Sequence, residues 1–249
     1  MRRRDLTWGS LWDIEQDGLF TAYYTDRSGK VNLMATESVV ERASARERLL
    51  VAASELFYEE GVHTVGVDRI VERAGVAKAT LYSLFGNKDG LVRAYLVARH
   101  DRTRERMMQE LAARFETPRD RLLGIFEVQG LSFIEPGFRG CAFVSANAES
   151  SPGSSVEEVT EDYRNWVRSL FFDSAKEAGA TDPEHLARQL VLLYDGAGIS
   201  AWMDHDANVA EAAQTVAAAL IDSAVPDDAR PVGRKSPLRS RRPADRHAK

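Results

Sequence analysis

A short run in the first half of the chain carries side chains whose chemistry suits contacts with nucleic acid. At about 100° of rotation per residue, a helix in this run places a set of small and polar residues on one side. Hydroxyls, a phenol and an ammonium suit phosphate oxygens and base edges, and a methyl group suits the methyl of thymine. The residues on this side are Ala79, Thr80, Tyr82 and Ser83, with Lys78 at its margin.

The flanking residues predict the elements that position this polar side. We expect a turn at Ala74-Gly75-Val76, a short helix from Lys78 to Phe85, and an end at Gly86-Asn87, where Asn87 caps the next helix. This is the pattern of a helix-turn-helix, which places a short helix in a DNA major groove. The pattern fits equally well a helical hairpin whose polar side is merely solvated. The opposite, apolar side is expected to be buried against the preceding helices through Leu81, Leu84 and Phe85.

The longer run from residue 45 to residue 96 decides between these readings. Its informative residues are Ala53, Leu56-Phe57, Gly61, Thr64-Val65, Val67, Ile70, Ala74-Gly75-Val76, Thr80-Leu81-Tyr82, Phe85, Lys88 and Leu91. In these residues the run resembles the N-terminal domain of TetR-family transcriptional regulators, and the resemblance covers roughly residues 43 to 105. The sequence departs from the family pattern at Ala77, where a small polar residue is usual, and at Ala79, where Gly is frequent. The first departure removes a helix-capping hydroxyl, which is worth about 1 kcal/mol.

The resemblance implies a role for each residue of a DNA-binding set. Thr80, Tyr82 and Lys88 are expected to hold phosphates, and Thr64, at the start of the second helix, is a further phosphate candidate. Lys78, Ala79 and Ser83 are expected to face bases. Asn87, beside Lys88, completes the set.

Composition argues against catalysis. Cys141 is the only cysteine, so no internal disulfide forms and a reducing compartment fits. The five histidines are scattered without metal-ligand spacing, and no glycine-rich phosphate loop occurs. We therefore expect no enzyme activity, no metal and no cofactor. Cys141 is interpreted as a small buried residue, with redox sensing as the alternative.

Targeting signals are also missing from the sequence pattern. No apolar run approaches the length of about 18 residues that a membrane helix needs. The Arg2-Arg3-Arg4 start is not followed by an apolar segment, so it does not resemble a signal peptide. A cytoplasmic protein is the expectation.

Charge is distributed unevenly along the chain, whose formal net charge is −5. Residues 41–106 carry 12 Lys and Arg against 10 Asp and Glu, whereas residues 107–226 carry 8 against 19. The acidic excess therefore lies outside the predicted DNA-binding part. Because that part is nearly neutral, its binding is expected to depend on a few placed contacts rather than on bulk attraction.

We predict an all-α protein of two domains with flanking extensions. Residues 1–42 are interpreted as a disordered extension or as upstream of a natural start near Met34. The alternatives are a folded domain and a DNA arm that uses Arg2, Arg3 and Arg4. The helix-turn-helix domain occupies residues 43–105, and a helical effector-binding and dimerisation domain occupies residues 106–224. Residues 225–249 are expected to form a basic disordered tail. Helices are predicted at 44–60, 67–73, 78–85, 88–115, 141–149, and from Thr117, Ser155, Asp182 and Asn208.

The sequence also predicts how some of these helices begin and which residues they bury. Thr117 is the expected cap ahead of Pro118, Ser155 is expected to form a capping box with Glu158, and Asn208 with Glu211 is expected to cap the last helix. The expected apolar stripe of the first helix is Leu49, Ala53, Leu56 and Phe57. Other residues expected to be buried are Val67, Ile70 and Val71, Met108 in the helix from Lys88, and Val209, Ala212, Val216, Ala217 and Leu220 in the last helix.

The resemblance implies a small-molecule pocket in the second domain, and aromatic residues of this domain are candidates for lining it, with plain core as the alternative. Such a lining suits an apolar or aromatic small molecule. Tyr194, Asp195 and His205 are candidate polar anchors. The lining candidates are Phe126, Phe133, Phe143, Trp166, Tyr194 and Trp202.

The last two helices, at about 182–205 and 208–222, are the predicted dimer contacts. The first contains Gly196 and Gly198 and the second is rich in Ala, which permits close backbone approach. A two-fold dimer implies a near-palindromic operator. The sequence thus predicts a homodimeric repressor that a small effector releases from DNA. The alternatives are a DNA-binding protein of the same fold that acts through a protein partner or without a ligand, and an enzyme or carrier on a helical scaffold.

Overall fold

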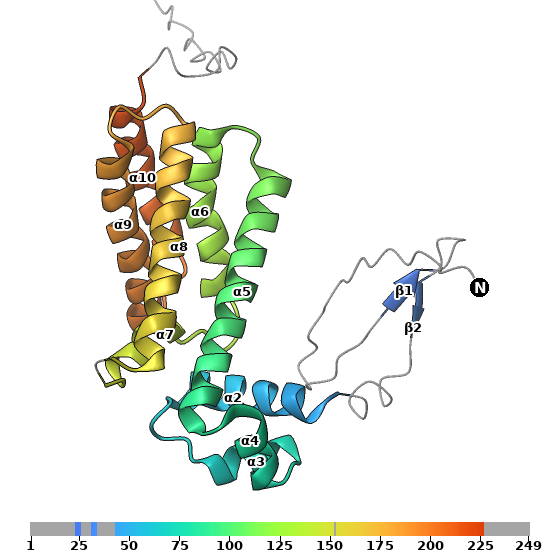
Figure 1. Cartoon of the computed structure of the whole chain (residues 1–249). Coiled ribbons are helices and arrows are strands. Elements are labelled where there is room, and N and C mark those ends of the chain that lie inside the picture. The colour runs from blue at the N-terminus through green and yellow to red at the C-terminus, as the bar shows by residue number, and fades with distance from the viewer. Residues whose placement is uncertain (1–22, 26–30, 34–42, 152, 227–249) are drawn as a thin grey trace, which may run out of the picture. The chain divides into compact units, whose positions relative to one another are not determined.

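Helices account for most of the residues that the structure describes (Figure 1). It is a computed structural model, and it describes residues 23–25, 31–33, 43–151 and 153–226. The prediction of an all-α fold is confirmed. The helices are α2 (Ala45–Glu60), α3 (Val67–Ala74), α4 (Lys78–Phe85), α5 (Lys88–Arg114), α6 (Pro118–Phe133), α7 (Ala142–Ala148), α8 (Ser155–Glu177), α9 (Pro183–Asp204) and α10 (Val209–Ala224).

Two short strands precede these helices. Strand β1 (Tyr23–Thr25) pairs antiparallel with β2 (Val31–Leu33), and Tyr24 lies opposite Asn32. The rest of the predicted extension, including Arg2, Arg3, Arg4 and Met34, lies outside the described residues, as does the predicted basic tail from residue 227.

The described helices divide into two compact units. The head unit contains α2, α3, α4, the start of α5 as far as Arg102, and residues 141–162, which include α7. The body unit contains residues 103–140 and those from Tyr163 onward. Helices α5 and α8 therefore each contribute residues to both units. The predicted division near residue 105 remains a prediction.

Local signals fix the beginning and end of α2 in the head unit. Ser44 Oγ accepts a hydrogen bond from the Glu47 N–H at 3.2 Å, and the Glu47 carboxylate accepts one from the Ser44 N–H at 2.7 Å. These bonds satisfy two free donors of the first turn, and they lower the pKa of Glu47. Gly61 ends the helix at φ +89°, with its N–H bonded to the Phe57 carbonyl. The predicted stripe of Leu49, Ala53, Leu56 and Phe57 is buried.

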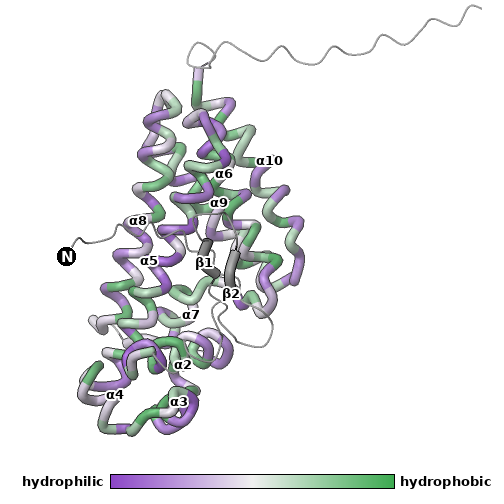
Figure 2. The backbone as a smooth tube through the Cα atoms, turned by 90° about the vertical axis from the view of Figure 1, so that its right-hand side faces the viewer, coloured by the Kyte–Doolittle hydropathy of each residue, from purple (hydrophilic) through white to green (hydrophobic). Residues whose placement is uncertain are grey.

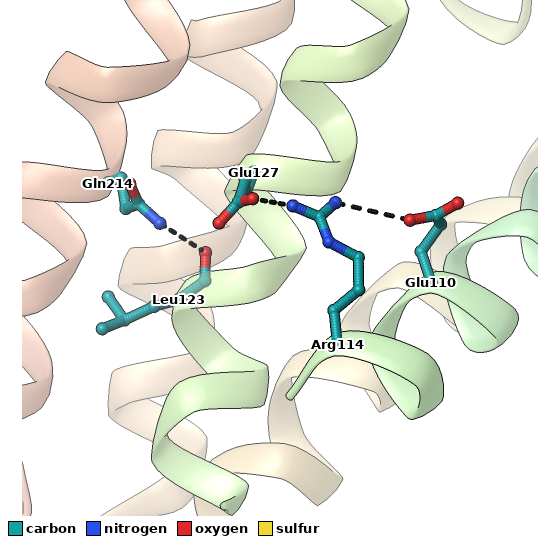
Figure 3. Close-up of polar contacts among 5 residues, drawn as sticks. All are labelled: Glu110, Arg114, Leu123, Glu127 and Gln214. Carbon is teal, nitrogen blue, oxygen red and sulfur yellow. Dashed lines mark hydrogen bonds and ion pairs between the residues drawn. The ribbon is translucent and has the colours of Figure 1, made fainter. Parts of the chain in front are cut away.

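The body unit is built around α6, α9 and α10, which pack against one another. Thr117 caps α6 and Pro118 occupies its first turn, as predicted. Helices α6 and α10 approach closely, since a Cβ on Gly130 would lie 2.6 Å from that of Ala210. Polar contacts also join helices of this unit. Figure 3 shows the guanidinium of Arg114 between the carboxylates of Glu110 and Glu127. It also shows Gln214 of α10, whose Nε2 donates to the Leu123 carbonyl of α6 at 3.5 Å.

Packing corrects several of the predicted core positions. Met107 is buried in α5 and Met108 is 49% exposed, and Val65 is buried ahead of α3 whereas Val67 is only half-buried. In α10 the predicted Val216 is exposed, and the buried residues are Ala213, Ala217 and Ile221. A helix has several apolar residues per turn, so its sequence alone leaves the direction of its partner open.

Two predicted caps are also wrong in detail. The side chain that accepts the first-turn N–H of α8 is that of Ser154, which bonds Glu157 N at 3.4 Å, rather than the expected Ser155 with Glu158. Asn208 precedes α10, but its amide bonds the Asp206 carboxylate at 2.7 Å and makes no capping bond. In both places a neighbouring side chain offers a competing local partner.

Hydrophobic and hydrophilic residues alternate along the long helices (Figure 2). This alternation is what amphipathic helices around a core require. Among the described residues, no helix is both long and apolar enough to cross a membrane.

Candidate nucleic-acid interface

The recognition helix α4 begins after a tight turn, as the sequence predicts. Gly75 ends α3 in the left-handed conformation at φ +61°, and its N–H bonds the Glu72 and Val71 carbonyls. Ala77 is the N-cap of α4 and makes no side-chain capping bond. The backbone there has φ −71° and ψ 145°, the extended conformation that a capping residue adopts. Helix α4 therefore begins without a side-chain cap, as the alanine at this position predicts.

The predicted polar side of α4 is open to solvent. Lys78, Ala79, Tyr82 and Ser83 are exposed, and Thr80 is half-buried. Leu81 is fully buried on the opposite side. The small and polar residues thus stand where a partner can reach them.

Leu84 is a correction, because it is 42% exposed rather than buried. Helix α4 contacts α2 and α3 along its Leu81 side. Leu84 lies about 60° of rotation away from Leu81, outside that contact. Phe85 is half-buried, and the Arg46 guanidinium of α2 lies 5.5 Å from its ring centroid. No local pattern signals this Arg46 contact, because its partners are far apart in sequence.

Ion pairs organise the cations near α4. Lys78 Nζ lies 2.7 Å from Asp68 Oδ1, and the hydrogen bond to this carboxylate raises the pKa of Lys78. Arg69 and Arg73 of α3 instead pair with Glu60 and Glu55 of α2. Exposed pairs of this kind contribute little stability.

The remaining DNA-contact candidates lie on either side of α4 in sequence. Thr64 is exposed in the turn before α3, three residues ahead of the helix rather than at its start. Lys88 Nζ donates to the His63 carbonyl at 3.4 Å, which brings the first residue of α5 against that same turn. Asn87 Oδ1 accepts from the Gly90 N–H at 2.8 Å, so the predicted cap of α5 is confirmed. The head unit therefore brings Thr64 and Lys88 together through His63.

The structure separates the six effector candidates. Phe126 and Tyr194 lie in one aromatic cluster of the body unit, with ring centroids 6.4 Å apart, and both also contact Phe171, which the sequence did not single out. Phe143 belongs to the head unit, where its ring meets that of His100.

The other candidates lie elsewhere in the body unit. Phe133 packs on Phe138. Trp166 packs on Tyr163. Trp202 is 45% exposed and close to Gly140.

The polar anchor candidates have partners of their own. Arg164 Nη1 lies 2.6 Å from Asp195 Oδ1, and the Tyr194 carbonyl accepts from Gln129 Nε2 at 2.9 Å. His205 is exposed, in the left-handed conformation that ends α9. Cys141 is half-buried as the N-cap of α7, rather than fully buried as expected. Among the described residues no group of His, Cys, Asp and Glu could hold a metal ion.

Comparison with known proteins shows that this chain is similar to transcriptional regulators. The family described as "Bacterial regulatory proteins, tetR family" matches residues 49–95. The transcriptional activator FasR of Mycolicibacterium smegmatis is 31% identical over 172 residues, which cover 66% of this chain and 75% of that protein. The regulator UidR of Escherichia coli is 26% identical over 125 residues, which cover 50% of this chain and 55% of UidR.

Solved structures give the same picture over a longer stretch. A TetR-family transcriptional regulator from Streptomyces coelicolor superposes with a TM-score of 0.68 at 31% identity, covering 72% of this chain and 95% of that one. A putative regulator from Streptomyces avermitilis gives 0.65 at 33% identity, covering 73% and 98%. The similarity therefore extends through both units.

Proposed function

Since this chain belongs to the TetR family of DNA-binding transcriptional regulators, we propose that it acts as a homodimeric repressor that a small effector releases from a near-palindromic operator. DNA-binding regulation follows from the family itself. The dimer, the effector and the sign of regulation are the parts of this proposal that need support from this chain's own residues.

The observation that carries the dimer is an apolar stripe on α9. Leu192, Ile199 and Met203 are 70%, 46% and 66% exposed, and Gly196 is exposed between them. Their spacings of four, three and four residues place them on one side of the helix. This side is separate from the buried side that carries Leu186, Leu190, Tyr194 and Ala197.

Helix α10 carries a matching stripe. Val216 is 50% exposed, and Ala212 and Ala219 are exposed at spacings of four and three residues. Because α9 and α10 pack on each other, we infer that one partner surface can cover both stripes. A second copy that brings the same two helices is a self-complementary partner for them. Gly196, with no atom within 4 Å of a Cβ placed on it, leaves room for close approach.

Dimerisation gives the recognition helix enough DNA to read. One eight-residue α4 reaches only a few base pairs. Two copies related by a two-fold axis read half-sites spaced by about 34 Å, one turn of DNA or a multiple of it. In this arrangement Thr80, Tyr82, Lys88 and Thr64 hold phosphates. Lys78, Ala79 and Ser83 face the bases, and Asn87 stands beside the backbone contacts.

The effector proposal draws on the interior of the body unit. The rings of Phe126, Phe171 and Tyr194 form an apolar cluster between α6, α8 and α9. Beside this cluster, Gln129 Nε2 donates a hydrogen bond to the Tyr194 carbonyl. Gln129 Oε1 is buried without a hydrogen-bond partner among the described residues. An unsatisfied buried acceptor favours a ligand that brings a donor. We infer an apolar or aromatic effector that carries a hydroxyl or an amine.

Release from DNA then follows from linkage between two states. An effector that prefers a different arrangement of the body helices changes the population of the DNA-competent dimer. Helix α5 is the element through which this change is carried, since it begins at Lys88 and ends at Arg114. Arg114 is tied to Glu127 of α6 (Figure 3), so a shift of α6 acts directly on the end of α5.

Two experiments test the proposal. Selection of bound fragments from a random-sequence pool should yield a near-palindrome, and sedimentation equilibrium should show a dimer. A monomer that selects a single half-site would contradict the proposal. Activation is the second candidate, because FasR is named an activator. A reporter under the selected operator separates the two, since its expression falls on addition of a repressor and rises on addition of an activator.

A further inference from the structure

A contact inside the head unit links α7 to the turn that precedes the helix-turn-helix. Glu149, the residue that ends α7, accepts a hydrogen bond from the His63 N–H to its Oε2 at 2.8 Å. The main-chain oxygen of Glu149 forms a second bond with His63 Nε2. A carbonyl oxygen only accepts, so the imidazole carries its proton on Nε2 in this contact. One residue of α7 thus holds both the backbone and the side chain of His63.

Gly61 makes room for this carboxylate. A Cβ at this position would lie 2.8 Å from Glu149 Oε1, so a larger residue would displace the carboxylate. The same glycine stands at φ +89°, a conformation that other residues rarely adopt. Gly61 therefore serves both to end α2 and to admit the side chain of Glu149.

The rest of α7 lies against the turn that carries His63. Ala142, Phe143 and Ala146 are buried. Residues of α7 and of the turn line one small hollow together, including Ala142, Ala146, Gly61 and Val62. Glu149 is thus the end of a docked helix and not a free side chain, which makes the position of His63 depend on α7.

His63 is also the residue that joins the two flanking phosphate candidates. Thr64 is its neighbour in sequence, and Lys88 Nζ donates to its carbonyl. We propose that Glu149 is a positioning residue, which holds the turn Gly61–Thr64 so that Thr64 and Lys88 meet DNA phosphates together. The inference rests on the proposed phosphate roles of Thr64 and Lys88, and it adds a residue far from the recognition helix to the DNA-binding apparatus.

The test compares Glu149→Ala with Glu149→Gln on a duplex that the wild-type chain selects from a random-sequence pool. Affinity is measured between about 50 and 200 mM salt, and thermal unfolding is recorded alongside. Alanine removes the acceptor for the His63 N–H, so we expect a loss of about tenfold and a salt slope lower by about one. Glutamine keeps an acceptor oxygen, and we expect it to restore the slope and most of the affinity. A purely structural role would lower the melting temperature and leave the slope unchanged.

Glu161→Ala is the matched control, because it removes an exposed carboxylate from the head unit, on α8. It should leave the salt slope at the wild-type value. An unchanged slope in Glu149→Ala overturns the positioning role. Lys88→Ala and Thr64→Val distinguish this outcome from a failure of the phosphate roles. If neither Lys88→Ala nor Thr64→Val lowers the salt slope, the phosphate roles of Lys88 and Thr64 are contradicted, and the positioning role of Glu149 is contradicted with them. If either lowers it while Glu149→Ala does not, only the positioning role falls.

Discussion

The exposed side of α4 and the exposed stripes of α9 and α10 are built from opposite chemistry. Helix α4 presents an ammonium, a phenol and a hydroxyl on Lys78, Tyr82 and Ser83, whereas α9 presents Leu192 and Met203 among its exposed residues. Phosphate contacts release counterions, so the proposed DNA binding at the first surface is expected to depend steeply on salt. Burial of apolar area depends mainly on the release of water, so association at the second surface depends little on salt.

The two surfaces also differ in how they are supported. Helix α4 has eight residues and only one fully buried side chain, Leu81. Helix α9 has 22 residues and a complete buried side behind its exposed stripe. The proposed DNA-reading surface is therefore expected to depend on a few specific contacts, whereas the proposed dimer surface rests on a helix with a large buried side. The first should therefore be sensitive to single changes in its support, and the second to changes in its own face.

The largest effect is expected from a charge placed on the proposed dimer stripe. In the proposed dimer, Leu192→Glu would place one carboxylate from each chain in the apolar interface, which costs several kcal/mol. We expect the dimer to dissociate about a hundredfold more readily or worse in sedimentation equilibrium, with a parallel loss of operator binding. Ile134→Glu is the control, since Ile134 is 68% exposed but lies at the end of α6. If the Leu192→Glu chain dimerises like the control, the exposed stripe of α9 is not the dimer surface.

The next effect concerns the support of α4. Leu81→Ala removes a fully buried side chain, so the free energy of unfolding should fall by about 3 kcal/mol. Leu84→Ala on the same helix removes an exposed side chain, and its cost should stay below about 1 kcal/mol. Urea unfolding measures both. Equal losses would mean that Leu84 is buried after all, and that α4 has a wider supporting contact than the structure shows.

Most residues with local partners are predicted well by the sequence, and the caps of α8 and α10 are the exceptions, because neighbouring side chains compete there. The starts of α5 and α9 agree with prediction, because Asn87 and Asp182 each accept a hydrogen bond from a backbone N–H three residues away and Pro183 occupies the first turn of α9. The same holds for Thr117 and Pro118 at the start of α6. Capping is a local interaction, so the residues themselves carry the information.

Residues whose partners lie far along the chain are those that the sequence misplaces or misses. The exposure of Leu84 depends on where α2 and α3 lie, and the burial of Met107 rather than Met108 depends on which side of α5 meets its neighbours. The contact of Glu149 with His63 joins residues that are 86 positions apart. The effector candidates show the same limit, because composition alone did not separate Phe143 of the head unit from Phe126 of the body unit.

A smaller effect is expected from a single phosphate contact at the polar surface. Lys88→Ala should weaken binding to all DNA sequences alike, by about fivefold, and lower the salt slope by about one. Lys78→Ala should instead change the preferred sequence, since Lys78 is proposed to face bases. Lys176→Ala removes an exposed lysine from α8 in the body unit and should change neither. An unchanged slope in Lys88→Ala would remove this residue from the contact set. The dimer constant of all three variants should match that of the wild type.

The smallest effect would sharpen the comparison by strengthening α4 itself. Ala77 already has the extended backbone of an N-cap but lacks an acceptor, so Ala77→Ser should place Oγ near the first free N–H groups of the helix. We expect the free energy of unfolding to rise by about 1 kcal/mol in urea, with the dimer constant unchanged. Ala79→Ser adds the same hydroxyl inside the helix, where serine is a poorer helix former than alanine, and it should lower stability by about 0.5 kcal/mol. If the two serines had the same effect, the weakness of α4 would not lie in its missing cap, and Leu81 alone would account for how this surface is held.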